Sequence, residues 1–358
     1  MVTIRDVARA SRVSVATVSR VINESPRVRE ATRLRVTKAA ARLGYWPNGI
    51  ARSLITNRTH ALGVLLPDLH GEFFSEVIRG IDLAARRRRL HLLVSSYSST
   101  AADLMSALRA VRGRVDGLIV MTPDVDASNA LPPRGWGAPT LLLNPELELP
   151  GYNSISIANV DGARAMVRHL LTLGHRRIAT ITGPERNIDA RQRLEGYRTA
   201  LCDDGLGPSP GFEILGDFTE RSGFEGAAQL LKLKPRPSVI VAANDYMAVG
   251  VLGALQDARV RVPEDVAVTG FDDVPMARYL TPPLTTVHVD MLELGQRAVE
   301  LLLGPADPTR ANGRHDVMSA TLVVRRSCGS KPPRQAASRM RWERRHAVAA
   351  TPRGNPRT

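Results

Sequence analysis

The chain is 358 residues long, with 43% hydrophobic, 23% charged and 4% aromatic residues. These proportions are ordinary for a globular protein, and the length predicts two or three domains. The longest apolar runs, such as Leu62–Leu66, are far shorter than the roughly 20 residues of a membrane-spanning helix, so we expect no membrane partner. The N-terminus has no apolar signal region, and Cys202 and Cys328 form no CxxC pair. Both features favour a cytoplasmic protein.

Positive charge is concentrated at the two ends of the chain. The formal net charge is +14, and residues 1–60 contribute +9 of it, from 12 basic and 3 acidic residues. Residues 325–358 contribute another +9, from 10 basic and 1 acidic residue, which leaves −4 for the residues between. A basic N-terminal module is typical of nucleic-acid binding, although a solvated surface could carry the same charge. Residues 327–358, with several prolines and no apolar period, predict a basic disordered tail.

Residues 1–46 predict an all-helical headpiece. A Thr3–Asp6 capping box begins a short helix that ends near Ala10, and residues 11–13 form a tight turn. Ser14 is then the expected N-cap of a second helix over residues 15–23. A third helix should cover residues 30–43 and end at Gly44. Two short helices joined by such a turn predict a helix-turn-helix, whose second helix enters the major groove of DNA.

The second helix has a buried stripe and an opposite face suited to DNA. We expect Arg20 to contact base edges, because its guanidinium can hydrogen-bond O6 and N7 of guanine together. The small side chains of Val15 and Ala16 suit thymine methyl groups, and the neighbouring hydroxyls suit phosphates. The DNA-binding residues predicted in the headpiece are Thr3, Ser14, Val15, Ala16, Thr17, Ser19, Arg20 and Asn23.

Two strings in this region resemble the N-terminus of LacI/GalR-family transcriptional regulators. They are T-V-S-R-V-I-N at residues 17–23 and P-N-G-I-A-R-S-L at residues 47–54. The resemblance implies a hinge and linker over residues 47–59, in which residues 48–54 fold when two chains pair over the minor groove. Its implied DNA contacts are Asn48, Ala51, Ser53 and Leu54, with Leu54 as a wedge in the central base step. Leucine is among the side chains that kink DNA, although a plain linker remains the alternative.

The headpiece departs from the family pattern at two positions. Arg12 stands in the turn where the family usually has Gly or Asn, and a positive φ there would cost about 1 kcal/mol. Arg29 stands where Ser often caps the third helix, so we expect a missing capping bond worth about 1 kcal/mol. Neither departure changes the side chains expected to face DNA.

Beyond residue 60, short apolar runs alternate with helical patterns. This alternation predicts α/β architecture with parallel sheets covered on both faces. We expect two doubly wound lobes, the first over residues 60–160 plus 289–326 and the second over residues 161–288. The expected strands are Leu62–Leu66, Leu92–Ser95, Leu118–Met121, Thr140–Leu143, Ile178–Ile181, Val239–Ala242, Val266–Thr269 and Thr321–Val324.

The resemblance to the family continues to about residue 328. Landmarks such as Gly174–Ile178, Arg193–Tyr197, Asn244–Ala248 and Gly270–Val274 carry it. It implies a body similar to periplasmic sugar-binding proteins, with a ligand between the lobes. Open α/β sheets bind ligands beyond the carboxyl ends of their strands, where several polar residues of this sequence fall.

The resemblance assigns an effector role to residues of both lobes. Arg193 and Asp272 are expected to hydrogen-bond ligand hydroxyls, and Asn244 to assist them. The full expected set is Asp68, Phe74, Asn144, Arg193, Phe218, Asn244 and Asp272. Simpler roles stay open, since Asp272 could cap a turn, Phe74 could belong to the core and Arg193 could merely pair with Asp272. The run Arg86–Arg89 ends a helix, where cations complement the helix dipole, so we expect a solvated helix end.

Motifs of catalysis are missing from the sequence. It has no phosphate-binding loop, no HExxH or Cys/His cluster and no G-x-S-x-G elbow, so we expect no enzyme activity, metal or cofactor. We expect a transcriptional regulator, a repressor, that binds a pseudo-palindromic double-stranded DNA operator as a homodimer. A small-molecule effector, a sugar or sugar derivative, would control it, with a sugar phosphate or a purine-like compound left open. An enzyme and a transport-type solute-binding protein are the rival classes.

Overall fold

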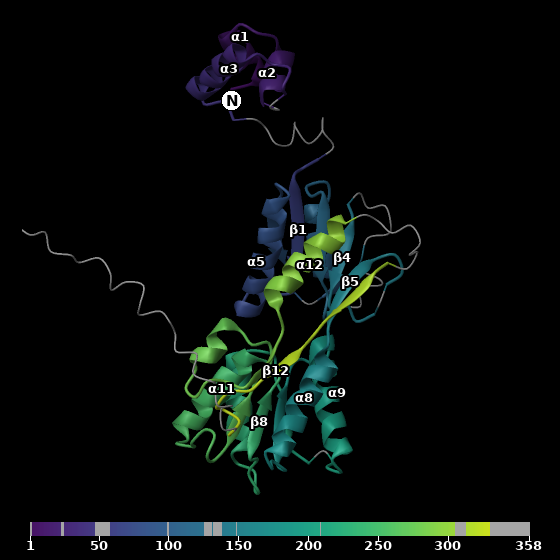
Figure 1. Ribbon diagram of the computed structural model, residues 1–358, viewed down its shortest axis with the longest axis vertical. Helices are drawn as coiled ribbons and strands as arrows, with labels where there is room; N and C mark the ends of the chain where they lie inside the picture. Colours follow the sequence, from purple (N-terminus) through teal and green to yellow (C-terminus); the bar gives the residue numbers. More distant parts are fainter. Residues whose placement is uncertain are drawn as a thin grey trace, which may run out of the picture.

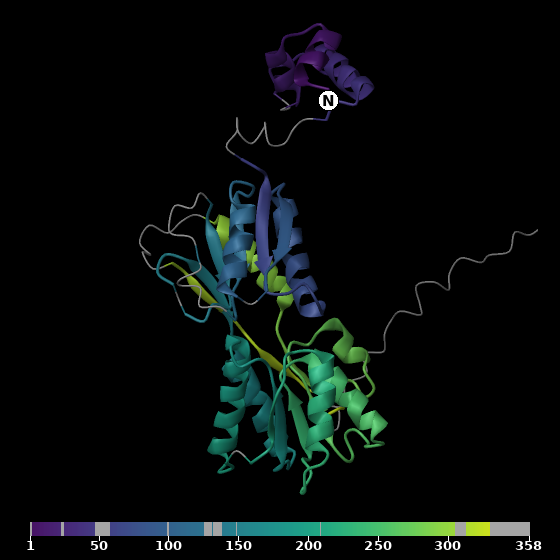
Figure 2. The same cartoon turned by 180° about the vertical axis from the view of Figure 1, so that it is seen from behind.

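The computed structural model describes most of the chain, as a three-helix headpiece and a two-lobed α/β body (Figures 1 and 2). The described residues are 2–22, 25–46, 58–98, 100–124, 131, 138–147, 149–207, 209–304 and 313–329.

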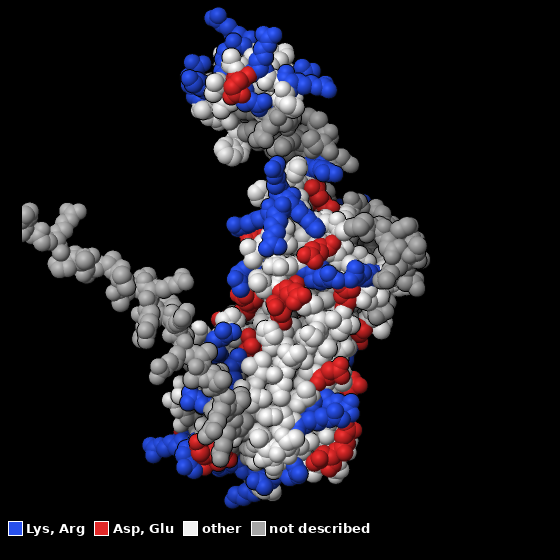
Figure 3. All heavy atoms as spheres, in the orientation of Figure 1, with Lys and Arg blue, Asp and Glu red and all other residues white. Residues whose placement is uncertain are grey.

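The headpiece contains helices α1 (Ile4–Ser11), α2 (Val15–Ile22) and α3 (Glu30–Leu43). Each helix contributes a valine to one small core, and Val7, Val18 and Val36 are all at most 1% exposed. Arginine and lysine side chains cover much of the face seen in Figure 3. A helix-turn-helix therefore forms where the sequence predicts it.

The helix ends in the headpiece follow the sequence closely. The Asp6 carboxylate accepts hydrogen bonds from the backbone N–H and the hydroxyl of Thr3 at 2.9 and 2.7 Å, and the Ser14 hydroxyl accepts one from the Thr17 N–H at 3.1 Å. Arg12 has a φ of 50°, so the expected strain in the turn is present. Arg29 provides no side-chain cap for α3, also as expected.

The N-terminal lobe is built on a six-stranded parallel sheet. Its strands, in spatial order, are β11 (His315–Met318), β5 (Asn153–Ile157), β4 (Thr140–Leu143), β3 (Gly117–Met121), β1 (Ala61–Leu66) and β2 (His91–Ser96). Helices α5 (Glu72–Arg87) and α12 (Met291–Leu303) pack together against one face of the sheet. Helix α6 (Ala101–Val111) covers the other face with a separate apolar cluster around Leu104 and Leu118.

The C-terminal lobe has a four-stranded parallel sheet. The spatial order is β7 (Glu213–Leu215), β6 (Ile178–Thr182), β8 (Val239–Ala242) and β9 (Ala267–Thr269). Helices α8 (Asn159–Thr172) and α9 (Ile188–Asp203) pack together, as do α10 (Glu220–Leu230) and α11 (Asp245–Asp257). A short 3₁₀ helix, η1 (Pro275–Tyr279), follows β9.

One expected boundary is wrong. Helix α12 and strand β11 return to the N-terminal lobe, but β12 (Thr321–Val323) pairs antiparallel with β10 (Thr286–His288) where the chain passes between the lobes (Figure 1). The chain then enters the C-terminal lobe, where the Val268 N–H donates to the Ser327 carbonyl at 2.9 Å and Cys328 is fully buried. The return to the first lobe therefore ends before residue 326, and the packed chain extends past residue 327. Residues 330–358, most of the expected tail, lie outside the described ranges.

None of the helices in the described ranges is long and apolar enough to cross a bilayer.

Candidate functional site

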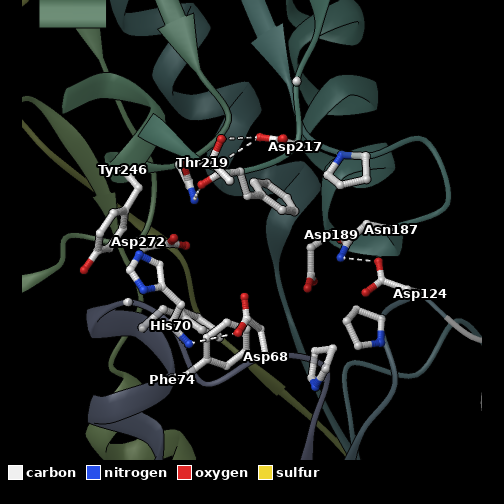
Figure 4. Close-up of a pocket in the computed structure, with 18 of the residues that line it drawn as sticks. Asp68, His70, Phe74, Asp124, Asn187, Asp189, Asp217, Thr219, Tyr246 and Asp272 are labelled. Carbon is white, nitrogen blue, oxygen red and sulfur yellow. Dashed lines mark hydrogen bonds between the residues drawn. The ribbon is translucent and has the colours of Figure 1, made fainter. Parts of the chain in front are cut away.

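A cavity of about 620 Å³ lies between the two lobes. The carboxyl ends of β1 and β3 reach it from one side, and those of β6, β7, β8 and β9 reach it from the other. Figure 4 shows the side chains that converge on it from both lobes. Its walls include Asp68, His70, Phe73, Phe74, Asp124, Asn187, Asp189, Arg193, Asp217, Phe218, Thr219, Asn244, Tyr246 and Asp272.

Arg193 is the best-connected cation of this cavity. It projects from α9, and its guanidinium donates to the Asn159 side-chain oxygen at 2.9 Å, the Ala243 carbonyl at 2.7 Å and the Asp272 carboxylate at 3.0 Å. Its Cζ lies 3.8 Å from the centroid of the Phe271 ring. A guanidinium with this many partners is fixed in place, so Arg193 has one orientation at the cavity wall.

Asp272 faces Arg193 from the loop after β9. It is 4% exposed and adopts a φ of 104°, in the left-handed region that non-glycine residues rarely occupy. Burial raises the pKa of Asp272 to about 6, although the nearby Arg193 charge opposes that rise. The expected pairing with Arg193 is present, and both side chains also line the cavity, so the pair remains available to a ligand.

Asp189 is a cavity residue that the sequence did not reveal. Its two oxygens accept hydrogen bonds from the Asn144 amide at 3.1 Å and the Asn159 amide at 2.7 Å. Burial raises the pKa of this carboxyl, and the charge of Arg193 partly offsets the effect. Because Asp189 lies only one turn from Arg193 along α9, its position on the same helix face was a signal that could have been used.

Two of the expected effector residues act as supports. Asn144 is buried but does not line the cavity, and it holds Asp189 from behind. Asn244 does line the cavity, but its side-chain oxygen caps α11 through the Met247 N–H at 2.8 Å and its amide donates to the Phe218 carbonyl at 3.1 Å. The expected contact of Asn144 with a ligand stays a prediction, and the contact that the structure shows is the one with Asp189.

Asp68, Phe74 and Phe218 lie where the sequence placed them, on the cavity wall. Asp68 is exposed, and its carboxylate accepts from the backbone N–H groups of Leu69 and His70 at 2.6 and 3.0 Å. Phe74 packs partly into the core and also lines the cavity, so its place in the core does not remove it from the cavity wall. Phe218 adopts a φ of 69°, which turns its ring toward the guanidinium of Arg193, 5.9 Å away.

Hydrogen bonds join the lobes on two sides of the cavity. On one side the Glu72 N–H donates to the Tyr246 hydroxyl at 2.8 Å, and the Met276 N–H donates to the Glu72 carboxylate at 3.0 Å. On the other side the Asn187 amide donates to Asp124 at 2.7 Å, as Figure 4 shows. The sequence did not identify Tyr246 or Asn187 as functional, because their roles depend on the approach of two separate lobes.

The headpiece presents most of its predicted DNA contacts to solvent. Thr3, Ser14, Val15, Ala16 and Arg20 are exposed, and Thr17 and Ser19 are half-buried. Asn23, Asn48, Ala51, Ser53 and Leu54 lie outside the residues that the structure describes. In the described ranges, no three His, Cys, Asp or Glu side chains are grouped as a metal site would require.

Comparisons with known proteins match both parts of this architecture. A family model for bacterial regulatory proteins of the lacI family matches residues 3–48, and one for a periplasmic binding protein-like domain matches residues 167–328. The ribose operon repressor of Escherichia coli (strain K12) is 37% identical over 305 residues, which cover 85% of this chain and 92% of that protein. The repressor PurR of Photobacterium profundum is 34% identical over 329 residues, covering 91% of this chain and 98% of that protein.

Solved structures agree with these relatives. The lac repressor dimer bound to operator and the anti-inducer ONPF has a TM-score of 0.79 and 32% identity, over 91% of this chain and 99% of that one. A LacI-family regulator of Enterococcus faecium with bound ribose has a TM-score of 0.65 and 26% identity, over 75% of this chain and 98% of that one.

A helix-turn-helix headpiece joined to a periplasmic-binding-protein-like body defines a DNA-binding transcription regulator rather than an enzyme. The chain belongs to the LacI family of bacterial regulatory proteins, and its relatives are transcriptional repressors.

Proposed function

We propose that this protein is a dimeric repressor of a pseudo-palindromic operator, and that an uncharged sugar binding between its lobes controls operator affinity. The observation that carries the effector half of the proposal is the buried arrangement of Arg193, Asp272 and Asp189 on the cavity wall. As a DNA-binding regulator it would act in the cytoplasm, where bacterial operators lie.

The chemistry of this wall suits a polyhydroxylated ligand. A guanidinium donates to hydroxyl oxygens, and carboxylates accept from hydroxyl hydrogens, so adjacent Arg and Asp groups match vicinal hydroxyls. The rings of Phe74 and Phe218 provide apolar surface for the C–H groups of a sugar. The ribose bound to the regulator of E. faecium supports a pentose or related sugar as the first compound to test.

The charge of the wall argues against a phosphorylated effector. The lining includes six carboxylates and two arginines, and one of those arginines, Arg193, is already paired with Asp272. Carboxylates therefore outnumber arginines on this wall. A sugar phosphate would add at least one further negative charge, which is unfavourable beside like charges in a partly buried site. A purine-like effector is the second candidate, because PurR and CytR are among the relatives.

The effector proposal can be tested by thermal unfolding of the full-length protein with ribose, other free sugars, their phosphates and nucleosides. A ligand at 100 times its Kd adds about 2.7 kcal/mol to the stability of the domain that binds it. Arg193→Lys should abolish the stabilisation, because Lys cannot reproduce the fork of three hydrogen bonds. Arg198→Lys, an exposed change on the same helix, is the matched control. A stabilising ligand that is unaffected by Arg193→Lys would place the effector elsewhere.

The operator proposal can be tested with duplexes that the full-length protein selects from a random-sequence pool. A dimer should select a two-fold related pair of half-sites. Arg20→Ala should weaken binding by about 1–3 kcal/mol and relax the preference at one position in each half-site. Leu54→Ala should reduce the bend of the bound DNA while leaving the thermal stability unchanged. A uniform loss across all sequences would make Arg20 a phosphate contact, and an unchanged bend would remove the wedge role of Leu54.

A further inference from the structure

The run Arg86–Arg89 is an exposed helix end, as expected, and two further arginines lie at the same end of the lobe. Arg86 and Arg87 lie in the last turn of α5, and Arg89 follows it just before β2 begins. Arg112 and Arg114 follow the end of α6, just before β3. All five side chains are exposed, and together they form what we call the arginine face.

Hydrogen bonds place the two halves of the arginine face next to the chain that arrives from the headpiece. The His91 N–H donates to the His60 carbonyl at 2.9 Å, so the segment after Arg89 lies beside residue 60. On the other side, the Asp116 carboxylate accepts from the Thr59 N–H at 2.6 Å, so the segment after Arg114 lies beside residue 59. The arginine face therefore surrounds the point where the body receives the headpiece linker.

The parallel topology puts this face at the end of the lobe away from the effector cavity. Strands β1, β2 and β3 all begin here, and β1 and β3 end at the cavity. Figure 3 shows basic side chains gathered at this end of the body, on the side of the headpiece. Trp46 and Arg58 are separated by 11 residues, which can span at most about 40 Å even when fully extended. A duplex bound by the headpiece is consequently held near the arginine face.

Favourable interaction with the helix dipoles does not explain all five arginines of the arginine face. Among the described residues, Arg86 pairs with Asp82, and no carboxylate pairs with Arg87, Arg89, Arg112 or Arg114. Arg114 lies three residues beyond the end of α6, farther from the helix terminus than Arg112. Arg88 differs from its neighbours because its guanidinium donates to the Val299 carbonyl at 2.9 Å and so supports α12.

The acidic side chains near the arginine face, Asp116 and Glu300, do not neutralise its positive charge. Asp116 is occupied by the backbone and hydroxyl of Thr59 and by the His60 N–H. Glu300, near the end of α12, pairs with Arg297. Unpaired, exposed guanidinium groups on a surface that faces bound DNA are the usual means of neutralising phosphates.

We propose that the arginine face is a second, sequence-independent DNA contact, through which the body of the regulator binds phosphates of the duplex held by the headpiece. This inference rests on the proposed operator binding. It predicts that part of the operator affinity, and of its dependence on salt, comes from the body rather than from the headpiece.

The test compares full-length variants on two duplexes, one selected by the wild-type protein from a random pool and one scrambled duplex of equal length. The variant Arg87→Gln, Arg112→Gln, Arg114→Gln removes three charges whose loss breaks no ion pair among the described residues. The matched control, Lys232→Gln, Lys234→Gln, Arg236→Gln, removes three exposed charges just before β8 of the C-terminal lobe. The measurement is the slope of log K against log salt concentration.

Each lost phosphate contact should reduce the steepness of that slope by about 0.9, so the triple variant should lose up to about 3 for each subunit and up to about 5 for a bound dimer. The loss of affinity should be the same factor on both duplexes, and replacement of the three arginines by lysine should restore the slope. A triple variant whose slope equals that of the control would overturn the proposal and leave the face for another partner. If the wild-type protein shows no preference between the duplexes, the operator proposal itself has failed, whereas a wild-type preference with unchanged slopes rejects the arginine face alone.

Discussion

Arg193 is held firmly within the fold and is also the side chain that we propose to bind the effector. Its guanidinium is held by an amide oxygen, a backbone carbonyl and a carboxylate, and a phenylalanine ring covers one face. Removing any of these partners would leave a buried donor unsatisfied, at a cost of about 1–3 kcal/mol. The same rigidity positions the guanidinium before a ligand arrives, which reduces the ordering required on binding.

The sequence predicted Arg193 and Asp272 but not Asp189, for a physical reason. An Asp in the first turn of a helix is usually a solvated group that favours the helix dipole. At Asp189 two asparagines from other elements, Asn144 and Asn159, bury the carboxylate and satisfy it. The spacing from Arg193 could have indicated the helix face of Asp189, but its burial depends on asparagines from both lobes, which no local pattern encodes.

The raised pKa of Asp272 predicts a pH dependence of stability. A carboxyl with a pKa of about 6 in the folded protein and roughly 3.9 in the unfolded chain binds more protons when folded between those values. Its contribution to the free energy of unfolding therefore falls as the pH rises from about 4 to 6, and is constant above about pH 7. We expect a change on the order of 1–3 kcal/mol, measured by chemical unfolding.

Asp272→Asn is the reference for this measurement, because Asn keeps an oxygen for Arg193 but does not titrate. The free energy of unfolding of the wild-type protein, minus that of the variant, should decrease as the pH rises from about 4 to 6. A difference that is constant across this range would show that Asp272 is ionised throughout, as a simple ion pair with Arg193.

At the scale of elements, the buried strands were the most predictable. The apolar runs of β1, β3, β4, β6, β8 and β9 match the structure to within about one residue at each end, because parallel strands that are buried on both faces read as continuous apolar runs. The strands β5, β7, β10 and β11 were not predicted. β7 and β11 are edge strands, β10 lies in the two-stranded pair between the lobes, and β5 lies inside its sheet next to β11. The edge strands mix polar with half-buried residues, as in Glu213–Leu215 and His315–Met318.

The contact between α5 and α12 is an element-scale feature that glycine makes possible. A Cβ at Gly80 would fall on the Leu292 carbonyl oxygen, and one at Gly295 would fall on the Val77 carbonyl oxygen. The two helices therefore pack backbone to backbone. Gly80→Ala should destabilise the N-terminal lobe by about 1–3 kcal/mol or more, despite the higher helix propensity of Ala, because the helices must separate.

Gly253→Ala in α11 is the matched control for this prediction. Its Cβ would meet only the Phe224 ring, at an ordinary distance of 3.6 Å. We expect this change to stabilise the protein by up to about 1 kcal/mol through helix propensity alone. Thermal unfolding of both variants should give shifts of opposite sign, and a neutral Gly80→Ala would show that the two helices are not so closely packed in solution.

At the scale of the whole molecule, the crossovers were harder to predict than the lobes. The expected return of the chain to the first lobe is correct for α12, and the strand β11, which was not predicted, also joins that lobe. The strand that was expected to return, β12, instead pairs with β10, and the segment to residue 329 belongs to the second lobe. The connections between the lobes pass through this antiparallel pair and the Ala158 turn. If the lobes move apart or together, these connections must bend. The hydrogen bonds across the cavity, such as the one between Glu72 and Tyr246, would then break or form.

The contact between Glu72 and Tyr246 provides the means to test such a change. The Glu72 N–H donates to the Tyr246 hydroxyl across the lobes, so this bond exists only when the lobes are close. A bond that stabilises the close arrangement adds to the affinity of any ligand that requires it. Tyr246→Phe should weaken binding of the effector by about 2–10-fold, the equivalent of one hydrogen bond. By linkage, the factor by which effector changes operator affinity should equal the factor by which operator changes effector affinity, in the variant as in the wild type.

Tyr279→Phe is the control, because Tyr279 is 78% exposed on η1 and can lose its hydroxyl without removing a contact between the lobes. Calorimetric titration of each variant with the sugar identified by thermal unfolding gives the effector affinity, and repeating it on the operator complex gives the coupling. If Tyr246→Phe binds the effector as tightly as Tyr279→Phe, the lobes do not rely on this bond. Their approach would then depend on the opposite side of the cavity, where Asn187 meets Asp124.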